Sequence, residues 1–161
     1  MALGAAAGAG IRGPAAPATE PTLTFLGPVA IHLPEDVGDW SIVDAEAFEP
    51  IRSSQALGGA RIEGAWGAVA PGGVVVTVLT AHLRLEGSGP DVLAALPNAG
   101  RATWTGREDH VASSQTVNGV RELVLVVLRG DLLTILGVSG PDSTFSSGAL
   151  EEAFRTAEVT S

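Results

Sequence analysis

Two long apolar runs separated by three polar-turn residues constrain the fold of this chain more than any other feature. Residues 123–128 read LVLVVL, residues 132–136 read LLTIL, and Arg129-Gly130-Asp131 stands between them. Branched runs of this length are typical of buried β-strands, whereas glycine followed by aspartate is typical of a tight turn. We therefore predict two adjacent antiparallel strands, with the chain reversing at Gly130.

The same triplet is known as a cell-adhesion signal when its arginine and aspartate are both exposed at the tip of a hairpin. A three-residue match arises often by chance, and two apolar strands require a polar turn in any case. We therefore interpret Arg129-Gly130-Asp131 as a turn without an adhesion role.

Further turn signals divide most of the remaining chain into short strands. Asn118-Gly119 is a strong hairpin signal, and Pro71-Gly72-Gly73 marks another turn. The runs at 74–79 and 123–128 have the composition of central strands that are buried on both faces. The expected strands are 23–26, 29–33, 40–43, 60–70, 74–86, two within 102–117 that are separated by a turn, 120–128 and 132–140.

Two segments have helical patterns. Residues 87–97, GSGPDVLAALP, fit a short helix that Pro97 ends, and this reading is favoured over an anion-binding loop because no βαβ unit follows. Residues 146–159 are the clearer helix, because apolar residues recur there with helical spacing. The stripe consists of Leu150, Ala153, Phe154 and Ala157, with Ser146 or Ser147 as the expected cap and Glu151 and Arg155 spaced for an ion pair.

These elements predict one α+β domain over residues 23–161. We expect a largely antiparallel β-sheet with helices packed on its faces, which is an αβα sandwich. Residues 1–22 are rich in Ala, Gly and Pro and are predicted to be a disordered leader, either a linker or part of an export signal. The sequence contains no run of about 18 apolar residues, so no membrane-spanning segment is predicted.

Charge and cysteine content narrow the classes of partner and chemistry. The formal net charge is −9, and the arginines form no cluster along the sequence, which argues against nucleic acid and anionic membranes as partners. Cysteine is absent, which excludes disulfides, thiolate metal sites, thiol nucleophiles and a lipobox in this sequence. The replacement of lysine by arginine, with abundant Ala, Gly and Val, is typical of bacterial genes rich in G and C.

The polar residues give little indication of catalysis. His32, His82 and His110 each have acidic neighbours, but none has the spacing of a metal-ligand motif, so no metal and no cofactor is predicted. A hydrolase that uses His110 with Glu108 or Asp109 is the weakest hypothesis, because no nucleophile elbow is present. We accordingly predict no catalytic residues.

The three tryptophans are the strongest candidates for a binding surface. Packing in the core is the favoured interpretation for Trp40, Trp66 and Trp104, because buried tryptophan contributes much of the apolar area of a small core. The alternative is that they form the rim of a groove for a ligand or partner between the sheet and its loops.

The layout resembles the PsbP/Mog-type αβα sandwich, and in particular the LpqN-type proteins of actinobacteria. The resemblance covers about residues 23–159 and rests on FLGPVAIHLPEDVGDW (25–40), on the strand and helix of 74–97, on the hairpins of 116–142 and on the closing helix. It implies a non-enzyme. The sequence leaves the compartment undetermined, with a bacterial extracytoplasmic or membrane-associated complex preferred to the cytoplasm.

Together these observations predict a non-catalytic binding or assembly accessory protein that contacts a protein partner through the sheet face or loop rim. The alternative hypothesis is a carrier of a small apolar ligand in a cavity between sheet and helix. A hydrolase is the least favoured function.

Overall fold

A computed structural model describes residues 22–43, 61–83 and 98–160 of the chain. The predicted leader, apart from Thr22, and the predicted helix within 87–97 lie outside these residues. In the described ranges every pair of neighbouring strands is antiparallel, which confirms the prediction of a largely antiparallel sheet.

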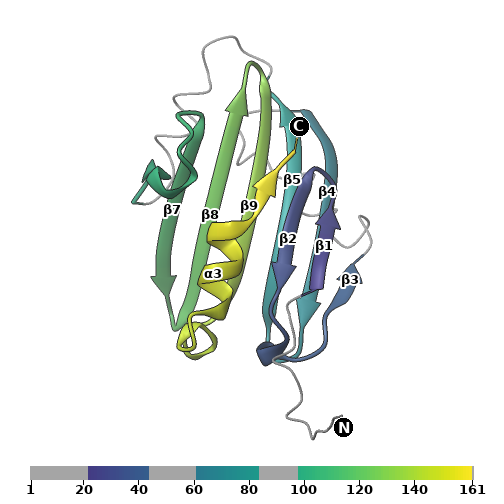
Figure 1. Ribbon diagram of the computed structural model, residues 1–161, viewed down its shortest axis with the longest axis vertical. Coiled ribbons are helices and arrows are strands. Elements are labelled where there is room, and N and C mark those ends of the chain that lie inside the picture. The colour runs from purple at the N-terminus through teal and green to yellow at the C-terminus, as the bar shows by residue number, and fades with distance from the viewer. Residues whose placement is uncertain (1–21, 44–60, 84–97, 161) are drawn as a thin grey trace, which may run out of the picture.

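Seven strands form the large sheet, in the spatial order β3-β4-β5-β9-β8-β7-β6. The strands 74–82 and 120–129, in which we predicted central runs, flank the middle strand of this sheet on either side (Figure 1). The bounds are β3 (Ser41–Val43), β4 (Arg61–Ala70), β5 (Val74–His82), β6 (Gly100–Arg101), β7 (His110–Val117), β8 (Val120–Arg129) and β9 (Leu132–Pro141).

The hairpin turns adopt the geometry that their sequences predict. Gly130 has φ +66° and is the only residue of its two-residue turn with positive φ, as a type II′ hairpin requires. Asn118 and Gly119 both have positive φ, at 52° and 78°, as a type I′ hairpin requires. The predicted reversals between β8 and β9 and between β7 and β8 are therefore confirmed.

A second, three-stranded sheet was not predicted. It has the order β1-β2-β10, with β1 (Thr22–Leu26) and β2 (Val29–Leu33) as a hairpin and β10 (Glu158–Val159) added from the end of the chain. This small sheet and the helix α3 (Ala149–Thr156) lie next to each other on one face of the large sheet (Figure 1). Residues 22–33 therefore belong to the layer that covers the large sheet rather than to that sheet. In the described residues this layer also contains α3, whereas the second predicted helix lies outside them.

The main hydrophobic core lies between the large sheet and this mixed layer. Alternate residues of β5, β8 and β9 point into it, because side chains on a strand alternate between the two faces. Its larger fully buried members include Leu26, Ile31, Val74, Val76, Val78, Leu125, Leu136 and Leu150.

Trp66 anchors the β1–β2 hairpin on β4. A methyl group on Gly27 would lie 2.5 Å from one atom of the Trp66 ring, and a methyl group on Gly64 would lie 2.3 Å from another. Only glycine therefore leaves room for the indole at these two positions, one in the hairpin and one on β4. Close packing of this kind explains how two sheets meet without a helix between them.

The helix α3 is shorter than predicted and differs at its start. Leu150, Ala153 and Phe154 are buried as expected, but Ala157 ends the helix. The N-cap residue is Gly148 rather than a serine, and Ser147 Oγ accepts a hydrogen bond from Ala149 N at 3.3 Å. Across the described ranges no helix is long and apolar enough to span a membrane.

One expected strand is a helical turn. Residues 103–105 form the 3₁₀ helix η4 (Thr103–Thr105), within a segment where we predicted a strand. Thr105 Oγ1 donates a hydrogen bond to the carbonyl of Ala102 at 2.8 Å, and Gly106 follows in the left-handed conformation at φ 68°. A threonine side chain that bonds its own backbone competes with the sheet, so the chain turns here and carries Trp104 toward α3.

Candidate functional site

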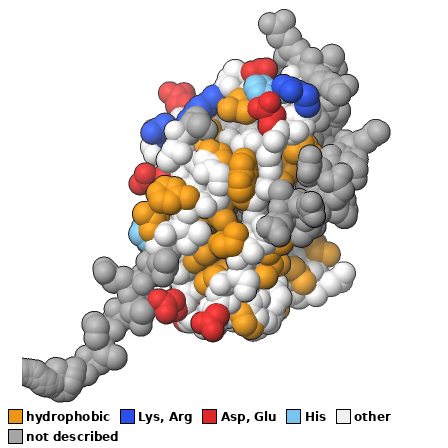
Figure 2. Space-filling view, turned by 90° about the vertical axis from the view of Figure 1, so that its right-hand side faces the viewer, with side chains coloured by type: hydrophobic (Ala, Val, Ile, Leu, Met, Phe, Trp, Pro, Cys, Tyr) orange, Lys and Arg blue, Asp and Glu red, His pale blue; other side chains and the backbone are white. Residues whose placement is uncertain are grey.

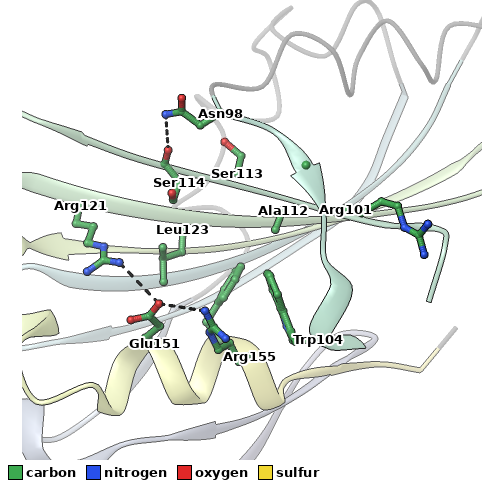
Figure 3. A pocket seen from close by; sticks show the side chains of 12 residues that line it. Asn98, Arg101, Trp104, Ala112, Ser113, Ser114, Arg121, Leu123, Glu151 and Arg155 are labelled. Carbon is green, nitrogen blue, oxygen red and sulfur yellow. Dashed lines mark hydrogen bonds and ion pairs between the residues drawn. The ribbon is translucent and has the colours of Figure 1, made fainter. Parts of the chain in front are cut away.

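A groove lies between the β6–β7–β8 end of the large sheet and α3 (Figure 3). Its volume is about 260 Å³. We call it the arginine groove, because it takes three of the nine basic residues of a chain whose net charge is −9. The residues that line the groove include Asn98, Arg101, Trp104, Ala112, Ser114, Arg121, Leu123, Glu151, Phe154 and Arg155.

The strands supply the floor of the arginine groove. Ala112 and Ser114 are two apart on β7, and Arg121 and Leu123 are two apart on β8, so each pair points to one face of the sheet. Ser114 is the cross-strand partner of Leu123, which places the two pairs side by side. The floor thus combines an apolar centre with a guanidinium at one end.

Aromatic rings form one wall. The ring centroids of Trp104 and Phe154 are 6.1 Å apart and their planes are inclined by 52°, a favourable tilted arrangement. Phe154 is buried, whereas Trp104 is 38% exposed. The guanidinium carbon of Arg155 lies 5.1 Å from the centre of the Trp104 ring, within cation–π range. Trp104 therefore offers one apolar surface to solvent while its position is fixed by two neighbours.

The charges of the groove are paired loosely. Glu151 Oε2 lies 3.8 Å from Arg121 Nη2 and 3.6 Å from Arg155 Nη2, so one carboxylate oxygen serves two guanidinium groups. Both distances exceed the value of about 2.7–2.9 Å that is typical of a charge-assisted hydrogen bond. Arg101 lies at the opposite end of the groove from Arg121 (Figure 3). Among the described residues, Arg121 and Arg155 have no shorter ion pair than the two with Glu151.

Of the three predicted rim residues, the structure places only Trp104 in this groove. Trp40 and Trp66 are partly buried against the main core, and neither lines the arginine groove. Trp40 Nε1 donates a hydrogen bond to the carbonyl oxygen of Pro34 at 2.7 Å, which satisfies its one polar group. Trp40 and Trp66 therefore pack against the core, which was the interpretation favoured from the sequence.

The arginines of the groove were not singled out from the sequence. Arg101, Arg121 and Arg155 belong to β6, β8 and α3, and no local motif connects them. The one signal in the sequence was the predicted pairing of Glu151 with Arg155, which the structure confirms. The pairing of Glu151 with Arg121 depends on how α3 packs on the sheet.

His110 and Asp109, which the hydrolase hypothesis named, do form a pair. His110 Nδ1 lies 2.8 Å from Asp109 Oδ1, and Arg129 Nε donates a hydrogen bond to Asp109 Oδ2 at 3.0 Å. The bond from Arg129 is the main reason that the pKa of Asp109 is lower than its usual value of 3.8. The third residue of that hypothesis, Glu108, is exposed on the loop before β7.

The hollow beside His110 has a volume of about 500 Å³ and contains two threonines among its lining residues. Thr105 Oγ1 donates to the carbonyl of Ala102 and Thr156 Oγ1 donates to the carbonyl of Glu152, each at 2.8 Å. Both hydroxyl groups are thus engaged with the backbone rather than with the imidazole. Among the described residues that line this hollow, no hydroxyl group is hydrogen-bonded to the His110 imidazole.

His82 lies between two carboxylates beside the turn that joins β8 and β9. Its Nε2 is 2.7 Å from Glu63 Oε2 and its Nδ1 is 3.0 Å from Asp131 Oδ2. The interaction with His82 is the main cause of a lowered pKa for Asp131. Since Arg129 is bonded to Asp109, both charged side chains of the triplet bind within the molecule, which favours its interpretation as a turn.

The candidate metal ligands do not converge. The carboxylates of Glu63 and Asp131 approach different nitrogens of the His82 ring, and His32 and His110 lie on other strands. Within the part of the chain that the structure describes, no cluster of three or more His, Asp or Glu side chains is arranged to hold a metal ion.

A third hollow lies between the small sheet and α3, with a volume of about 510 Å³. We call it the apolar hollow; it is lined by Leu23, His32, Pro34, Ala149, Glu152, Ala153 and Thr156. Leu23 and Phe25 on β1 are 48% and 67% exposed. Figure 2 shows hydrophobic side chains distributed over the middle of this side of the molecule.

Comparison with known proteins gives no match: no protein-family model, no curated protein and no solved structure is similar to this chain. The resemblance to PsbP/Mog-type and LpqN-type proteins therefore stays a prediction, and the function has to be argued from the geometry of the three hollows.

Proposed function

We propose that this chain is a non-catalytic binding protein that holds an extended segment of a protein partner in the arginine groove. The observation that carries the proposal is the convergence of Arg121, Arg155 and the exposed face of Trp104 on one hollow. Arginine and tryptophan are the residue types that contribute most often to the energetic centre of protein interfaces.

The two walls of the groove fit a peptide better than a wholly apolar molecule. One side is polar, with Asn98 and Ser114 joined by a hydrogen bond of 3.0 Å from the amide to the backbone carbonyl. Another part of the lining is apolar, with Leu123 in the floor and Trp104 in the aromatic wall. An extended peptide presents amide groups and side chains in alternation, so it can satisfy both walls at once.

The volume also favours a short segment over a drug-sized ligand. Pockets for such ligands enclose about 300–1,000 Å³ and bury most of the ligand. The arginine groove has about 260 Å³ and is partly open to solvent, so it accommodates one or two residues of a longer chain. The proposal thus keeps the protein partner expected from the sequence. It assigns this partner to the arginine groove, which Trp104 lines and Trp40 and Trp66 do not.

Selection of a random peptide library displayed on phage tests this proposal. We expect the immobilised protein to enrich a set of related peptides, and Trp104→Ala to bind them about tenfold or more weakly, because the exposed aromatic face is lost. Ile42→Ala is the matched control, since Ile42 is an exposed apolar residue on β3, at the opposite edge of the sheet. Equal binding by Trp104→Ala, or no enrichment at all, would contradict the proposal.

A second candidate function, the carrier of a small apolar ligand, is favoured by the apolar hollow. Ala149 and Ala153 leave space there between α3 and the small sheet, and Leu23 forms the opposite wall. We expect binding of a fluorescent naphthalene dye to be lost in Ala149→Trp, whose larger ring fills the space. Unchanged dye binding in that variant would remove this candidate.

A further inference from the structure

We infer that the arginine groove recognises a ligand in which a carboxylate lies next to an apolar side chain. In the free protein the Glu151 carboxylate occupies the position that the ligand carboxylate takes. This inference rests on the proposed function, because it names the chemistry of the segment that the groove binds. It assigns Glu151 a role that no sequence motif indicates.

The first step is the position of Glu151. Its Oε2 atom lies between Arg121 Nη2 and Arg155 Nη2, at 3.8 and 3.6 Å, so a carboxylate already sits where two guanidinium groups meet. The long distances indicate attraction without a directed hydrogen bond. An ion pair of this kind between partly exposed groups contributes little, so an incoming carboxylate displaces it at small cost.

The second step is that both guanidinium groups are held in place by aromatic rings. The guanidinium carbon of Arg155 is 5.1 Å from the centre of the Trp104 ring, and that of Arg121 is 5.2 Å from the centre of the Phe145 ring. Stacking on a ring leaves the N–H edge of arginine available for a planar acceptor. A carboxylate is such an acceptor and binds arginine through two parallel hydrogen bonds.

The third step is the apolar surface next to this pair of arginines. Trp104 and Leu123 line the groove beside Arg155 and Arg121, as Figure 3 shows. A ligand whose carboxylate reaches the guanidinium groups therefore places its neighbouring atoms against apolar carbon. The last residue of a protein chain, when it is hydrophobic, has this combination, and so has an acidic side chain next to an aromatic residue.

The tryptophans provide a direct readout. Three indole N–H resonances are expected in a ¹H–¹⁵N spectrum, and the one that Trp104→Phe removes belongs to the groove. Trp40 and Trp66 are packed against the core and serve as internal controls. The probes are N-acetyl-Leu-Phe with a free carboxylate, the same dipeptide as its amide, N-acetyl-Glu-Phe amide, and inorganic phosphate.

We expect the acid to shift the Trp104 resonance and to bind about tenfold more tightly than the amide, since only the acid offers an acceptor to both arginines. Comparison with N-acetyl-Glu-Phe amide identifies the source of the carboxylate, a chain end or a side chain. Equal affinity for acid and amide, or tighter binding of phosphate than of either carboxylate, would overturn the inference and leave the proposed function standing. If none of the dipeptides moves the Trp104 resonance, the inference and the proposed function are both contradicted.

The variants separate the role of Glu151 from general charge effects. Glu151→Gln is expected to bind the acid about threefold to tenfold more tightly, because the competing carboxylate is gone. Glu35→Gln, at an exposed residue that lines none of the three hollows, changes the net charge equally and should leave the affinity unchanged. Arg121→Gln should weaken binding about tenfold, whereas Arg61→Gln, on β4, should not. Equal effects of Glu151→Gln and Glu35→Gln would exclude the displacement.

Discussion

At the scale of single residues, the groove depends on a few side chains whose neighbours keep them in one place. Trp104 contacts the Phe154 ring and the Arg155 guanidinium and is still 38% exposed, so two neighbours order a side chain that a ligand can reach. A rigid aromatic surface loses little conformational entropy on binding, which is why such residues are effective anchors.

Gly130 gives the first prediction at this scale. Its φ of +66° lies in the region that β-branched residues avoid, while no atom lies within 4 Å of the position that a Cβ would occupy. The cost of a side chain is therefore conformational, and Gly130→Val should lower the free energy of unfolding by about 1 kcal/mol or more. Gly130→Asn, which tolerates positive φ, should cost less.

Urea denaturation of both variants measures this difference, and equal losses of unfolding free energy in Gly130→Val and Gly130→Asn would contradict it.

Asp131→Glu keeps the charge of the triplet but ends its use as an adhesion signal. We expect this variant to bind every ligand as the unchanged protein does. Loss of partner binding with stability intact would make the hairpin tip a functional site and would refute the turn interpretation.

Asp109 predicts a dependence of stability on pH. Its pKa is lowered from 3.8, chiefly by the hydrogen bond from Arg129, so the folded state favours the charged carboxylate. Such a group stabilises the fold at pH values above its unfolded pKa, and the contribution is lost as the pH falls through the lower folded pKa. Asp109→Asn should therefore be less stable than the unchanged protein at neutral pH, with a difference that declines below about pH 4.

Urea titrations of both proteins across this range check the sign. A difference in the free energy of unfolding that stays constant into acid would show that the amide changes packing rather than charge. Arg129→Gln gives the complementary test, because removal of the donor raises the pKa of Asp109 and should reduce the pH dependence.

At the scale of elements, α3 connects the core to the groove. Leu150, Ala153 and Phe154 are buried on its inner side, whereas Glu151 and Arg155 reach the groove. One short helix thus supports the hydrophobic core and supplies two of the charges that we assign to ligand binding. A change on its inner side is expected to affect both properties.

Phe154→Ala tests this dual role. The ring is 4% exposed and contacts the Trp104 ring, so its removal should lower the free energy of unfolding by about 3–5 kcal/mol. Glu152→Ala, exposed on the same helix, should change it by less than about 0.5 kcal/mol. A loss below about 1 kcal/mol in Phe154→Ala, measured by urea denaturation, would mean that α3 does not close the core.

At the scale of the whole molecule, local signals in the sequence predicted the hairpins and long-range pairing decided the rest. Asn118-Gly119 and Gly130 determine their turns through their own backbone preferences, so β7, β8 and β9 could be ordered correctly. The pairings of β5 with β9 and of β2 with β10 join segments far apart in the sequence. No local pattern specifies such partners, and the small sheet was accordingly missed.

For the candidate site too, local signals predicted single residues, whereas the packing of distant elements decided which residues meet. Trp104 was a candidate because a large aromatic residue is conspicuous in any sequence. The strand predicted for it was wrong, since Trp104 lies in the 3₁₀ helix η4. Arg101 and Arg121 could not be connected with Arg155, because three elements bring them together only after the sheet and α3 have packed. The sequence also offered Trp40 and Trp66 with equal strength, and burial alone distinguishes them from Trp104.

A crystal structure of the protein with bound N-acetyl-Leu-Phe tests the central claim, that the arginine groove is the binding site, most directly. We expect the dipeptide in the groove, with its carboxylate about 2.7–2.9 Å from guanidinium nitrogens of Arg121 or Arg155. Its apolar side chain should contact Trp104, and the Glu151 carboxylate should have moved away from the arginines. A dipeptide bound in the apolar hollow beside Leu23, with Glu151 still between the two arginines, would contradict this claim.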